Sequence, residues 1–483
     1  MPTTHLRKIY RGHFGLMTDL YQLTMAYGYW KAERHNQRAA FNLFYRKPPF
    51  GGDFVLAAGL ELAVDFLQQY RCSTGDIQYL GGLKGPTGEP LFDEGFLNYL
   101  QRMELGLDVY AMPEGTVAFP NQPLLRVEGP LLQCQLVETG LLTLINFSTL
   151  LATKAARIVE AARGDSVLEF GMRRSQGLDG AMTAARATYI GGCHATSNVM
   201  AGRLYGIPVK GTHAHSWVMC FEDELLAFQR YAEALPDNCI FLVDTYDTAD
   251  GIRNAIRVGH WLRDNGHEMT GIRLDSGDLT ELSKMARQLL DEAGFPQAAI
   301  VASNDLDEYQ IKTLKEKGAT INIWGVGTRL ATAYGDPALG GVYKLAAVQN
   351  EKGEWENRIK RSEEIIKVTN PGLLQVWRGY RAAQPAGDIL YDIRHGLNGK
   401  QLHREGRKEA QSLSEVEGGD LLQPVLKNGN LVYDFPGLPQ VRAYAGQQWQ
   451  QFRSIDAANY PHGLSEGLYA EKKSLMEAVS GQE

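Results

Sequence analysis

Between residues 167 and 347, short apolar runs alternate with segments rich in helix-forming residues. The runs are residues 167–170, 207–209, 240–243, 270–274, 300–302, 321–324 and 342–347. Intervening segments such as 249–264, 279–293 and 306–317 have about the length that a right-handed crossover needs. Short strands joined by such crossovers form a parallel sheet, and this many units in series favours a closed or nearly closed barrel. The pattern therefore predicts an irregular, TIM-like α/β barrel.

The segments on either side of this region have a different character. Residues 109–132 form short apolar runs broken by four prolines, which is typical of a small β-rich unit. Beyond residue 349 the chain becomes more polar, and residues 405–419 are strongly charged. A chain of 483 residues has room for two or three domains. We therefore expect a β-rich N-terminal domain at 1–135, the barrel at 136–350 and a peripheral, partly β C-terminal region at 351–483.

The composition limits the kinds of binding partner and the cellular compartment that we expect for this protein. The formal net charge of −7 argues against nucleic acid, whose phosphate backbone requires a basic face. The five cysteines are odd in number and contain no Cys-x-x-Cys pair, which is typical of reduced thiols rather than a disulfide framework or zinc cage. No stretch reaches the roughly 18 apolar residues of a membrane span. We expect a soluble, cytoplasmic protein that does not enter a membrane.

The run 207–209 leads into GTHAHSW, which carries His213 and His215. Three interpretations of this turn remain open. His215 is an ordinary hydrogen-bonded loop histidine, or the two histidines are ligands of a metal-dependent barrel hydrolase. In the third interpretation His215 is a nucleophile or proton carrier, with Thr212 and Ser216 offering hydroxyls to a neighbouring phosphate.

The run 270–274 ends in RLDSGDL, where Arg273 and Asp275 share one face of the strand end and Asp278 begins the next helix. An arginine beside a carboxylate is often only a structural ion pair. At the carboxyl end of a strand, the same residues suit a diphosphate and its Mg²⁺, because arginine binds phosphate bidentately and carboxylates hold the metal. The sequence favours this second interpretation.

Two further strand ends and one helix carry candidate binding residues. Gly327 and Thr328 close the turn GVGT, which could cradle a phosphate with backbone N–H groups, although glycines end strands for many reasons. Phe170 and Arg173 follow another strand and would suit a flat aromatic acid, unless they are a core ring and a solvated cation. Tyr21 lies in an expected N-terminal helix, where packing is its simplest function.

Seven motifs in order identify a family. GLMTDLYQLTM, EFGMRRSQG, GTHAHSW, RLDSGDL, SNDLDE, GVGT and LGGVYKL together closely resemble nicotinate phosphoribosyltransferase, from about residue 15 to residue 350. The resemblance implies the first step of NAD salvage from nicotinic acid. In that reaction nicotinate and 5-phosphoribosyl-1-diphosphate give nicotinate mononucleotide and diphosphate, coupled to ATP hydrolysis.

The resemblance also implies an architecture. Type II phosphoribosyltransferases join an irregular α/β barrel to a β-rich α+β domain built from N- and C-terminal segments. They are typically homodimers whose active site is shared between subunits, and Mg²⁺ is the expected cofactor with ATP as a co-substrate.

Residue roles follow from the resemblance motif by motif. His215 is similar to the histidine that ATP phosphorylates, and Asp275 to a catalytic and Mg²⁺-binding carboxylate, with Asp278 as a second metal ligand. Tyr21 resembles the ring that a partner subunit brings over the pyridine, and Phe170 the ring on its other face. The remaining substrate-binding positions are Arg173, Thr212, Arg273, Gly327 and Thr328.

Other functions remain open. Nicotinamide-using relatives carry an aspartate in the segment that corresponds to residues 196–202, which has no carboxylate here. This difference favours the acid over the amide, and nicotinamide phosphoribosyltransferase is the alternative within the enzyme class. From other classes, the alternatives are a metal-dependent hydrolase using His213 and His215, and a non-catalytic sensor of 5-phosphoribosyl-1-diphosphate.

Overall fold

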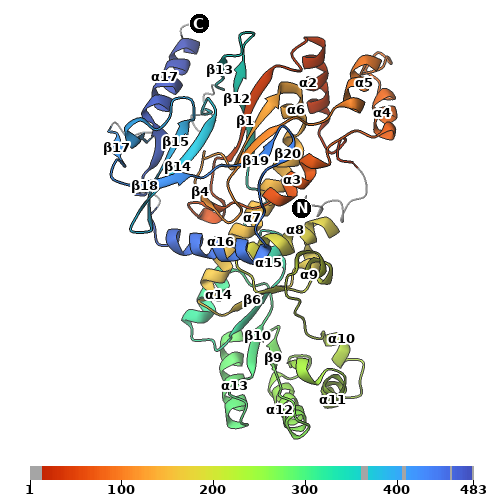
Figure 1. Ribbon diagram of the computed structural model, residues 1–483. Coiled ribbons are helices and arrows are strands. Elements are labelled where there is room, and N and C mark those ends of the chain that lie inside the picture. Colours follow the sequence, from red (N-terminus) through yellow and green to blue (C-terminus); the bar gives the residue numbers. More distant parts are fainter. Residues whose placement is uncertain (1–12, 361–367, 405–408, 457–458, 481–483) are drawn as a thin grey trace. The chain divides into compact units, whose positions relative to one another are not determined.

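The computed structural model describes residues 13–360, 368–404, 409–456 and 459–480. The chain forms two compact units (Figure 1). The first unit contains residues up to Leu150 together with the chain from Ala338 onward, and the second unit contains Leu151–Pro337. The first unit is therefore made of two segments that are separated in sequence by the whole of the second.

The second unit is built on a six-stranded sheet in which every described pairing is parallel. The strand order is β7-β6-β11-β10-β9-β8. Their bounds are β6 Ser166–Glu169, β7 Ala195–Thr196, β8 Ile240–Leu242, β9 Gly271–Leu274, β10 Ala299–Ala302 and β11 Ile323–Val326. Five of the seven predicted runs thus coincide with parallel strands. Residues 207–209 instead form only an isolated parallel bridge, between Val209 and Thr196.

Each strand of this sheet is followed by a helix, as the alternation of apolar runs and helix formers predicts. The helices of the second unit are α8 Gly177–Ile190, α9 Val199–Tyr205, α10 His215–Val218, α11 Glu224–Ala234, α12 Thr248–Asp264, α13 Leu279–Glu292, α14 Glu308–Glu316 and α15 Thr328–Ala331. Strands β8, β9 and β10 are almost wholly buried, and α12 and α13 cover them with their apolar faces (Figure 1). These strands and helices share one continuous hydrophobic core, which holds the carboxyl ends of the strands in place.

The first unit contains a seven-stranded antiparallel sheet of order β13-β12-β1-β5-β3-β19-β20. Its bounds are β1 Arg38–Tyr45, β3 Asp108–Ala111, β5 Leu125–Pro130, β12 Gly341–Gln349, β13 Trp355–Asn357, β19 Gln423–Lys427 and β20 Asn430–Leu431. Strand β12 corrects the prediction that residues 342–347 belong to the barrel. It pairs antiparallel with β1, because a short apolar run buries equally well in either kind of sheet.

A second, six-stranded sheet of the first unit has the order β17-β16-β21-β15-β14-β18. Its bounds are β14 Leu374–Arg381, β15 Gln384–Asp392, β16 Gln401–His403, β17 Gln411–Ser412, β18 Glu417–Asp420 and β21 His462–Ser465. A two-stranded sheet joins β2 Val55–Leu56 to β4 Val117–Ala118. The helices that begin in this unit are α2 Leu20–Lys31, α3 Leu60–Gln68, α4 Thr74–Gly81, α5 Glu94–Arg102, α6 Leu131–Leu136, α7 Glu138–Ala161, α16 Leu438–Phe452 and α17 Glu466–Ser480.

Helix α7 is, among the described residues, the one helix long and apolar enough by length and composition to cross a membrane. However, 61% of its apolar window is buried inside the protein. Leu150, Leu151 and Ile158 all lie in the interior. Its apolar character is therefore accounted for by packing.

Candidate functional site

The predicted site residues of the second unit follow the carboxyl ends of strands of the parallel sheet. Phe170 directly follows β6, Asp275 directly follows β9, and Gly327 directly follows β11. Because parallel strands end at the same edge of a sheet, these turns converge on one side of it. That is the side on which α/β enzymes place their chemistry.

His215 is the first residue of the short helix α10 and is half-buried. Its Nδ1 atom lies 3.1 Å from the hydroxyl oxygen of Thr245. Its Nε2 atom lies 3.9 Å from Oδ2 of Asp275. The His215 imidazole and the Arg273 guanidinium therefore lie beside the same carboxylate, that of Asp275. One imidazole nitrogen contacts the Thr245 hydroxyl and the other is directed at Asp275.

The Arg273 guanidinium connects three separate strand ends. Its Nε donates to the Ser303 hydroxyl at 2.8 Å, and its Nη1 donates to the Thr212 hydroxyl at 2.8 Å. Its Nη2 donates to Oδ1 of Asp275 at 3.0 Å. A fork fixed on three sides is pre-organised, so little side-chain entropy remains to be lost when it meets an anion.

Asp275 is held as a carboxylate. Burial alone would raise its pKa, but hydrogen bonds from Ser303 and Arg273 and the charge of that guanidinium outweigh burial and lower the pKa. Its side chain is 31% exposed, so part of it is open to a ligand. The arrangement offers a negative charge beside a fixed positive one.

Asp244, for which the sequence indicated no role, is the second carboxylate of this group. Its Oδ2 accepts hydrogen bonds from the Asp275 backbone N–H at 2.9 Å and from the Ser276 hydroxyl at 2.6 Å. Its Oδ1 is buried and lacks a hydrogen-bond partner within the described part of the chain. A buried, unpaired carboxylate oxygen is costly unless something binds it, which marks Asp244 as a candidate cation ligand.

Asp278, predicted as a metal ligand, has a different set of contacts. Its Oδ1 accepts from the N–H groups of Thr280 and Glu281 at 3.0 and 3.3 Å, which makes it the N-cap of α13. This is a usual function of aspartate at the start of a helix. Asp244, rather than Asp278, shares hydrogen bonds with the turn that carries Asp275.

His213 is a buried, neutral histidine. Its Nε2 accepts the N–H of Leu242 at 3.2 Å, and its Nδ1 lies 3.4 Å from the Ala214 carbonyl, which can only accept. Burial lowers the pKa of His213 to about 4. With the lone pair on Nε2 already used, His213 anchors the GTHAHS turn to β8. No group of three or more metal-ligating side chains occurs in the described residues, so the geometry does not support the hydrolase alternative.

Phe170 packs against the neighbouring strand β11. A Cβ atom added at Gly325 would come within 2.7 Å of the Phe170 ring, so only glycine leaves room for it. The ring is half-buried. Arg173 is exposed in the short turn Met172–Arg174, and Thr328 is the first residue of α15. Phe170 and Arg173 therefore follow the same strand, β6, and the GVGT turn lies at the end of the adjacent strand, β11.

Comparisons with known proteins bear on this site. Residues 16–146 match the nicotinate phosphoribosyltransferase (NAPRTase) N-terminal domain, and residues 166–361 match the nicotinate phosphoribosyltransferase (NAPRTase) family. A nicotinate phosphoribosyltransferase from Bacillus subtilis is 42% identical over 479 residues, covering 97% of this chain and 96% of the relative. The chain belongs to the nicotinate phosphoribosyltransferase family. It is therefore an enzyme, and the family resemblance read from the seven motifs is confirmed.

Other members of the nicotinate phosphoribosyltransferase family agree. The enzyme of that name from Dictyostelium discoideum is 39% identical over 507 residues, covering 92% of this chain and 84% of the relative. The crystal structure of human nicotinic acid phosphoribosyltransferase superposes with a TM-score of 0.82 at 33% identity, covering 95% of this chain and 99% of that one. The mixed α/β fold is thus that of the nicotinate phosphoribosyltransferase family.

Glu169 is a buried residue near the site that the sequence reasoning missed. Its side chain accepts the backbone N–H of Gly171 and, at 2.6 Å, the hydroxyl of Thr196. Burial raises the pKa of Glu169, although both hydrogen bonds oppose that shift. Its only signal in the sequence was its place inside the EFGMRR motif, one residue before the ring. The carboxylate fixes the turn that carries Phe170 to the neighbouring strand β7.

Tyr21 lies in the first unit, whereas the other candidates lie in the second. It is 50% exposed on α2, next to Leu20 at 53% and near Met17 at 50%. Three large apolar side chains exposed together are typical of a surface that another molecule covers.

Proposed function

We propose that this enzyme joins nicotinate to 5-phosphoribosyl-1-diphosphate, releasing nicotinate mononucleotide and diphosphate, and that a phosphorylated His215 couples the reaction to ATP hydrolysis. The observation that carries the proposal is the 3.9 Å separation between His215 Nε2 and the Asp275 carboxylate, which Arg273 holds in place. The names of the relatives support the two substrates.

The diphosphate binds at Arg273. Its guanidinium meets phosphate oxygens bidentately, and the hydroxyls of Thr212 and Ser303 keep it oriented. Asp275 and Asp244 would hold Mg²⁺, because one or two carboxylates plus substrate phosphates are its usual protein ligands. The unpaired, buried Oδ1 of Asp244 fits such an ion, which supplies positive charge to the leaving diphosphate.

The glycosyl transfer needs orientation more than acid–base catalysis. The pyridine nitrogen uses its own lone pair to bond C1 of the ribose, while the bond from C1 to the diphosphate oxygen breaks and its electrons leave with the diphosphate. Positive charge develops on the ribose in between, and the Asp275 carboxylate would stabilise that charge. No general base is required.

His215 supplies the link to ATP. In the tautomer whose Nδ1–H donates to the Thr245 hydroxyl, Nε2 keeps its lone pair and attacks the γ-phosphorus as the bond to ADP breaks. The phosphoryl group on His215 then adds negative charge beside Asp275, one of the two residues that would hold Mg²⁺, and an ion held there would strengthen binding of the sugar diphosphate. Later attack of water on that phosphoryl group returns free His215 and phosphate.

The nicotinate ring binds at Phe170. The Phe170 ring offers one flat face, and Arg173 offers a cation for the carboxylate. Tyr21 of the second subunit would cover the other face, and the exposed apolar residues around it support a homodimer. Gly327 and Thr328 bind the 5-phosphate in this arrangement.

We also infer that the parallel sheet is part of an irregular barrel in a cytoplasmic enzyme. The segment 207–213 supports closure of the barrel, because it contacts both edge strands of the sheet. Val209 pairs with Thr196 on β7, and His213 accepts the N–H of Leu242 on β8. The β-rich domain would then be the one assembled from the N- and C-terminal segments.

The phosphohistidine is tested with His215→Asn. We expect ATP hydrolysis during nucleotide synthesis to be lost, because asparagine cannot accept a phosphoryl group, while some uncoupled transfer persists at high sugar-diphosphate concentration. His260→Asn, an exposed histidine on α12, is the matched control. Undiminished ATP turnover in His215→Asn would refute the coupling, and phosphate absent from His215 by mass spectrometry would refute the intermediate.

The choice of pyridine is tested by comparing nicotinate with nicotinamide in one coupled assay. We expect nicotinate to be preferred, and Arg173→Gln to reduce the preference, because the arginine pairs with the carboxylate and not with the amide. Equal use of the two substrates by the unmodified enzyme would contradict the proposal.

A further inference from the structure

Lys210 lies in the segment beside β7, and it has no function in the reaction as proposed. The backbone N–H of Thr196 donates to the Pro208 carbonyl at 3.0 Å, and the backbone N–H of Lys210 donates to the Thr196 carbonyl at 3.1 Å. These two bonds are the pattern of a parallel bridge centred on Val209 and Thr196. Residues 208–210 therefore run beside β7 as a short extended segment.

The Lys210 side chain points away from the helices. Side chains of an extended segment point alternately to its two faces, so Lys210 and Val209 point in opposite directions. A Cβ atom added at Gly202 on α9 would come within 2.2 Å of Cγ2 of Val209, which shows that Val209 packs against this helix. Lys210 therefore points to the other face of the segment, and it is exposed.

The face of Val209 continues across β7 and β6. Thr196 pairs with Val209, and the Thr196 hydroxyl donates to the Glu169 carboxylate at 2.6 Å, so these three side chains share one face. Phe170 directly follows Glu169 and therefore points to the opposite face. That is the face to which Lys210 also points.

The core of the second unit identifies the same two faces elsewhere in the sheet. Val167 on β6 and Ile272 on β9 both belong to the core that the helices cover. Arg273 directly follows Ile272, and Phe170 lies three positions after Val167, so both point to the opposite face. Phe170, Arg273 and Lys210 therefore share the face that carries the proposed substrate contacts.

Phe170, Ser197 and Lys210 also lie in one row across the sheet. Each directly follows a residue of the register that joins β6, β7 and residues 208–210. Neighbouring strands are about 4.8 Å apart, so the backbones at Phe170 and Lys210 are about 10 Å apart. A pyridine on the Phe170 ring and an extended lysine side chain can together bridge that distance.

The order of the strands decides which group of the substrates Lys210 would meet. Gly327 and Thr328, the proposed 5-phosphate turn, follow β11, which borders β6 on the side away from β7. Arg273 on β9 lies farther in that same direction. A nicotinate ring on Phe170 would therefore direct its nitrogen toward the β11 side, where the sugar binds. Its carboxylate would project toward β7 and Lys210.

We propose that Lys210 binds the nicotinate carboxylate and, with Arg173, makes the site prefer the acid over the amide. The inference rests on the proposed function, because it takes Phe170 as the ring on which the pyridine stacks. An ammonium is a compact charge with three rotatable donors, so it pairs with a carboxylate without a fixed geometry. The amide of nicotinamide has no charge for it to pair with, which is the physical basis of the preference.

Lys210→Met tests the proposal, because methionine removes the charge and keeps an unbranched side chain of similar length. We expect the KM for nicotinate to rise about 10- to 100-fold, as for loss of a charge-assisted hydrogen bond. The constants for nicotinamide, as substrate or as competitor, and for the sugar diphosphate should stay within about twofold. Lys210→Arg keeps a cation and should restore most of the preference. Lys312→Met, an exposed lysine on α14, is the matched control.

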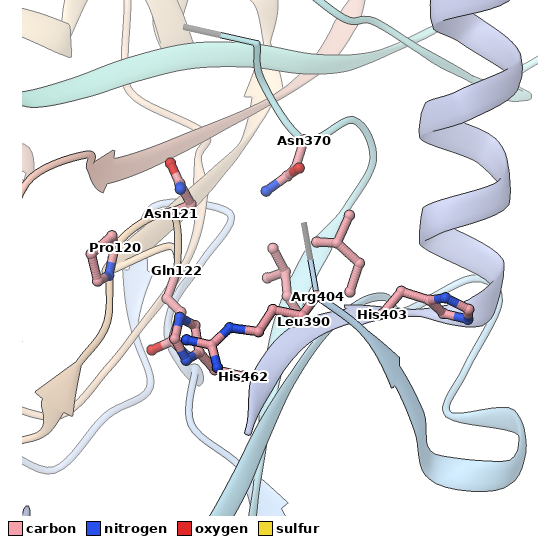
Figure 2. A pocket seen from close by; sticks show the side chains of 10 residues that line it. Pro120, Asn121, Gln122, Asn370, Leu390, His403, Arg404 and His462 are labelled. Atoms are coloured by element: carbon pink, nitrogen blue, oxygen red, sulfur yellow. The ribbon is translucent and has the colours of Figure 1, made fainter. Parts of the chain in front are cut away.

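A second control separates loss of contact from loss of stability. Gln122 borders a cavity of about 220 Å³ in the first unit (Figure 2), and its Nε2 donates to Asp388 at 2.8 Å. Gln122→Leu removes this buried hydrogen bond, so it should lower the denaturation midpoint and leave the preference for the acid unchanged. Lys210→Met should do the reverse, because Lys210 is exposed.

Three results would overturn the assignment of Lys210. The first is an unchanged KM for nicotinate in Lys210→Met. The second is a rise confined to the sugar diphosphate, which would place the ammonium at a phosphate. The third is an equal loss for nicotinate and nicotinamide, which would mean that Lys210 does not distinguish the carboxylate. Each of these leaves the proposed function intact, since failure of that function would appear in the unmodified enzyme as equal use of the two pyridines.

Discussion

Arg273 shows how one side chain can organise a site made from distant parts of the chain. Its three donor nitrogens reach Thr212, Ser303 and Asp275, which follow three different strands or strand-like segments. Only a planar guanidinium can hold all three partners at once. A lysine would preserve the charge and lose the geometry.

Arg273→Lys should therefore separate charge from orientation. We expect the KM for 5-phosphoribosyl-1-diphosphate to rise about 10- to 100-fold, because hydrogen bonds to charged groups contribute about 1.5–3 kcal/mol each. Steady-state kinetics with the sugar diphosphate varied would measure this. Arg253→Lys on the exposed face of α12 is the control and should change nothing. A KM within twofold of the original would mean that charge alone suffices.

His213 makes the stability of the second unit depend on pH. Its pKa is lowered to about 4, below the value of about 6.5 in an unfolded chain, so the unfolded chain binds more protons between these values. The stabilisation is complete above pH 6.5 and is lost as the pH falls toward 4. The loss amounts to about 3 kcal/mol.

His213→Gln tests this dependence, since glutamine can still accept the Leu242 N–H but does not titrate. Denaturant unfolding at several pH values should show a flatter profile between pH 6.5 and 4 than the unmodified enzyme. His260→Gln should keep the original profile. If His213→Gln retains the full loss of stability on acidification, then other groups cause it.

At the scale of elements, the sequence predicted most of the second unit and less of the first. Strands β8, β9 and β10 were predicted because each is a buried run followed by an amphipathic helix, a pattern with few other solutions. Strand β7 is only two residues long, too short to show any periodicity. Strand β12 was assigned to the wrong sheet because its partner β1 lies about 300 positions away.

In the candidate site, too, local patterns could be predicted and contacts between distant segments could not. His215, Arg273 and Asp275 could be predicted because each motif carries its chemistry within a few residues. The position of Asp244 beside them could not, because it depends on hydrogen bonds from the Asp275 N–H and the Ser276 hydroxyl, which follow the neighbouring strand β9. Which strands are neighbours is a property of the sheet order, and the local sequence does not contain it.

Gly325 illustrates how a strand shapes the site through the absence of a side chain. Gly325→Ala would bring a methyl group within 2.7 Å of the Phe170 ring. We expect a loss of about 1–3 kcal/mol in unfolding free energy and a raised KM for nicotinate, because the ring must move. Gly446→Ala in α16 has open space around it and should be neutral or stabilising. An unchanged KM would show that the ring does not contact substrate.

At the scale of the whole molecule, the first unit depends on a charged pair in its interior. Arg378 and Asp388 are both fully buried and pair across β14 and β15. Gln122 and the Tyr460 hydroxyl also donate to Asp388, each at 2.8 Å. The aspartate therefore ties the N-terminal segment to the C-terminal one.

Asp388→Asn should destabilise the first unit strongly. Removing one partner leaves an uncompensated buried guanidinium, which costs about 3–5 kcal/mol. The denaturation midpoint followed by tryptophan fluorescence should fall accordingly. Glu417→Gln, an exposed acid on β18, is the control and should shift the midpoint little. A small loss in Asp388→Asn would mean that the arginine finds another anion or water.

The split construction of the first unit has a consequence for biosynthesis. Strands β1, β5 and β3 are translated early, but the outer neighbours of β1 and β3, which are β12 and β19, begin only at residues 341 and 423. On the ribosome, the outer edges of β1 and β3 therefore stay unpaired while the inserted unit is translated and folds. Such edges invite wrong pairing between nascent chains, so we expect the yield of active enzyme to depend on translation rate and chaperone supply.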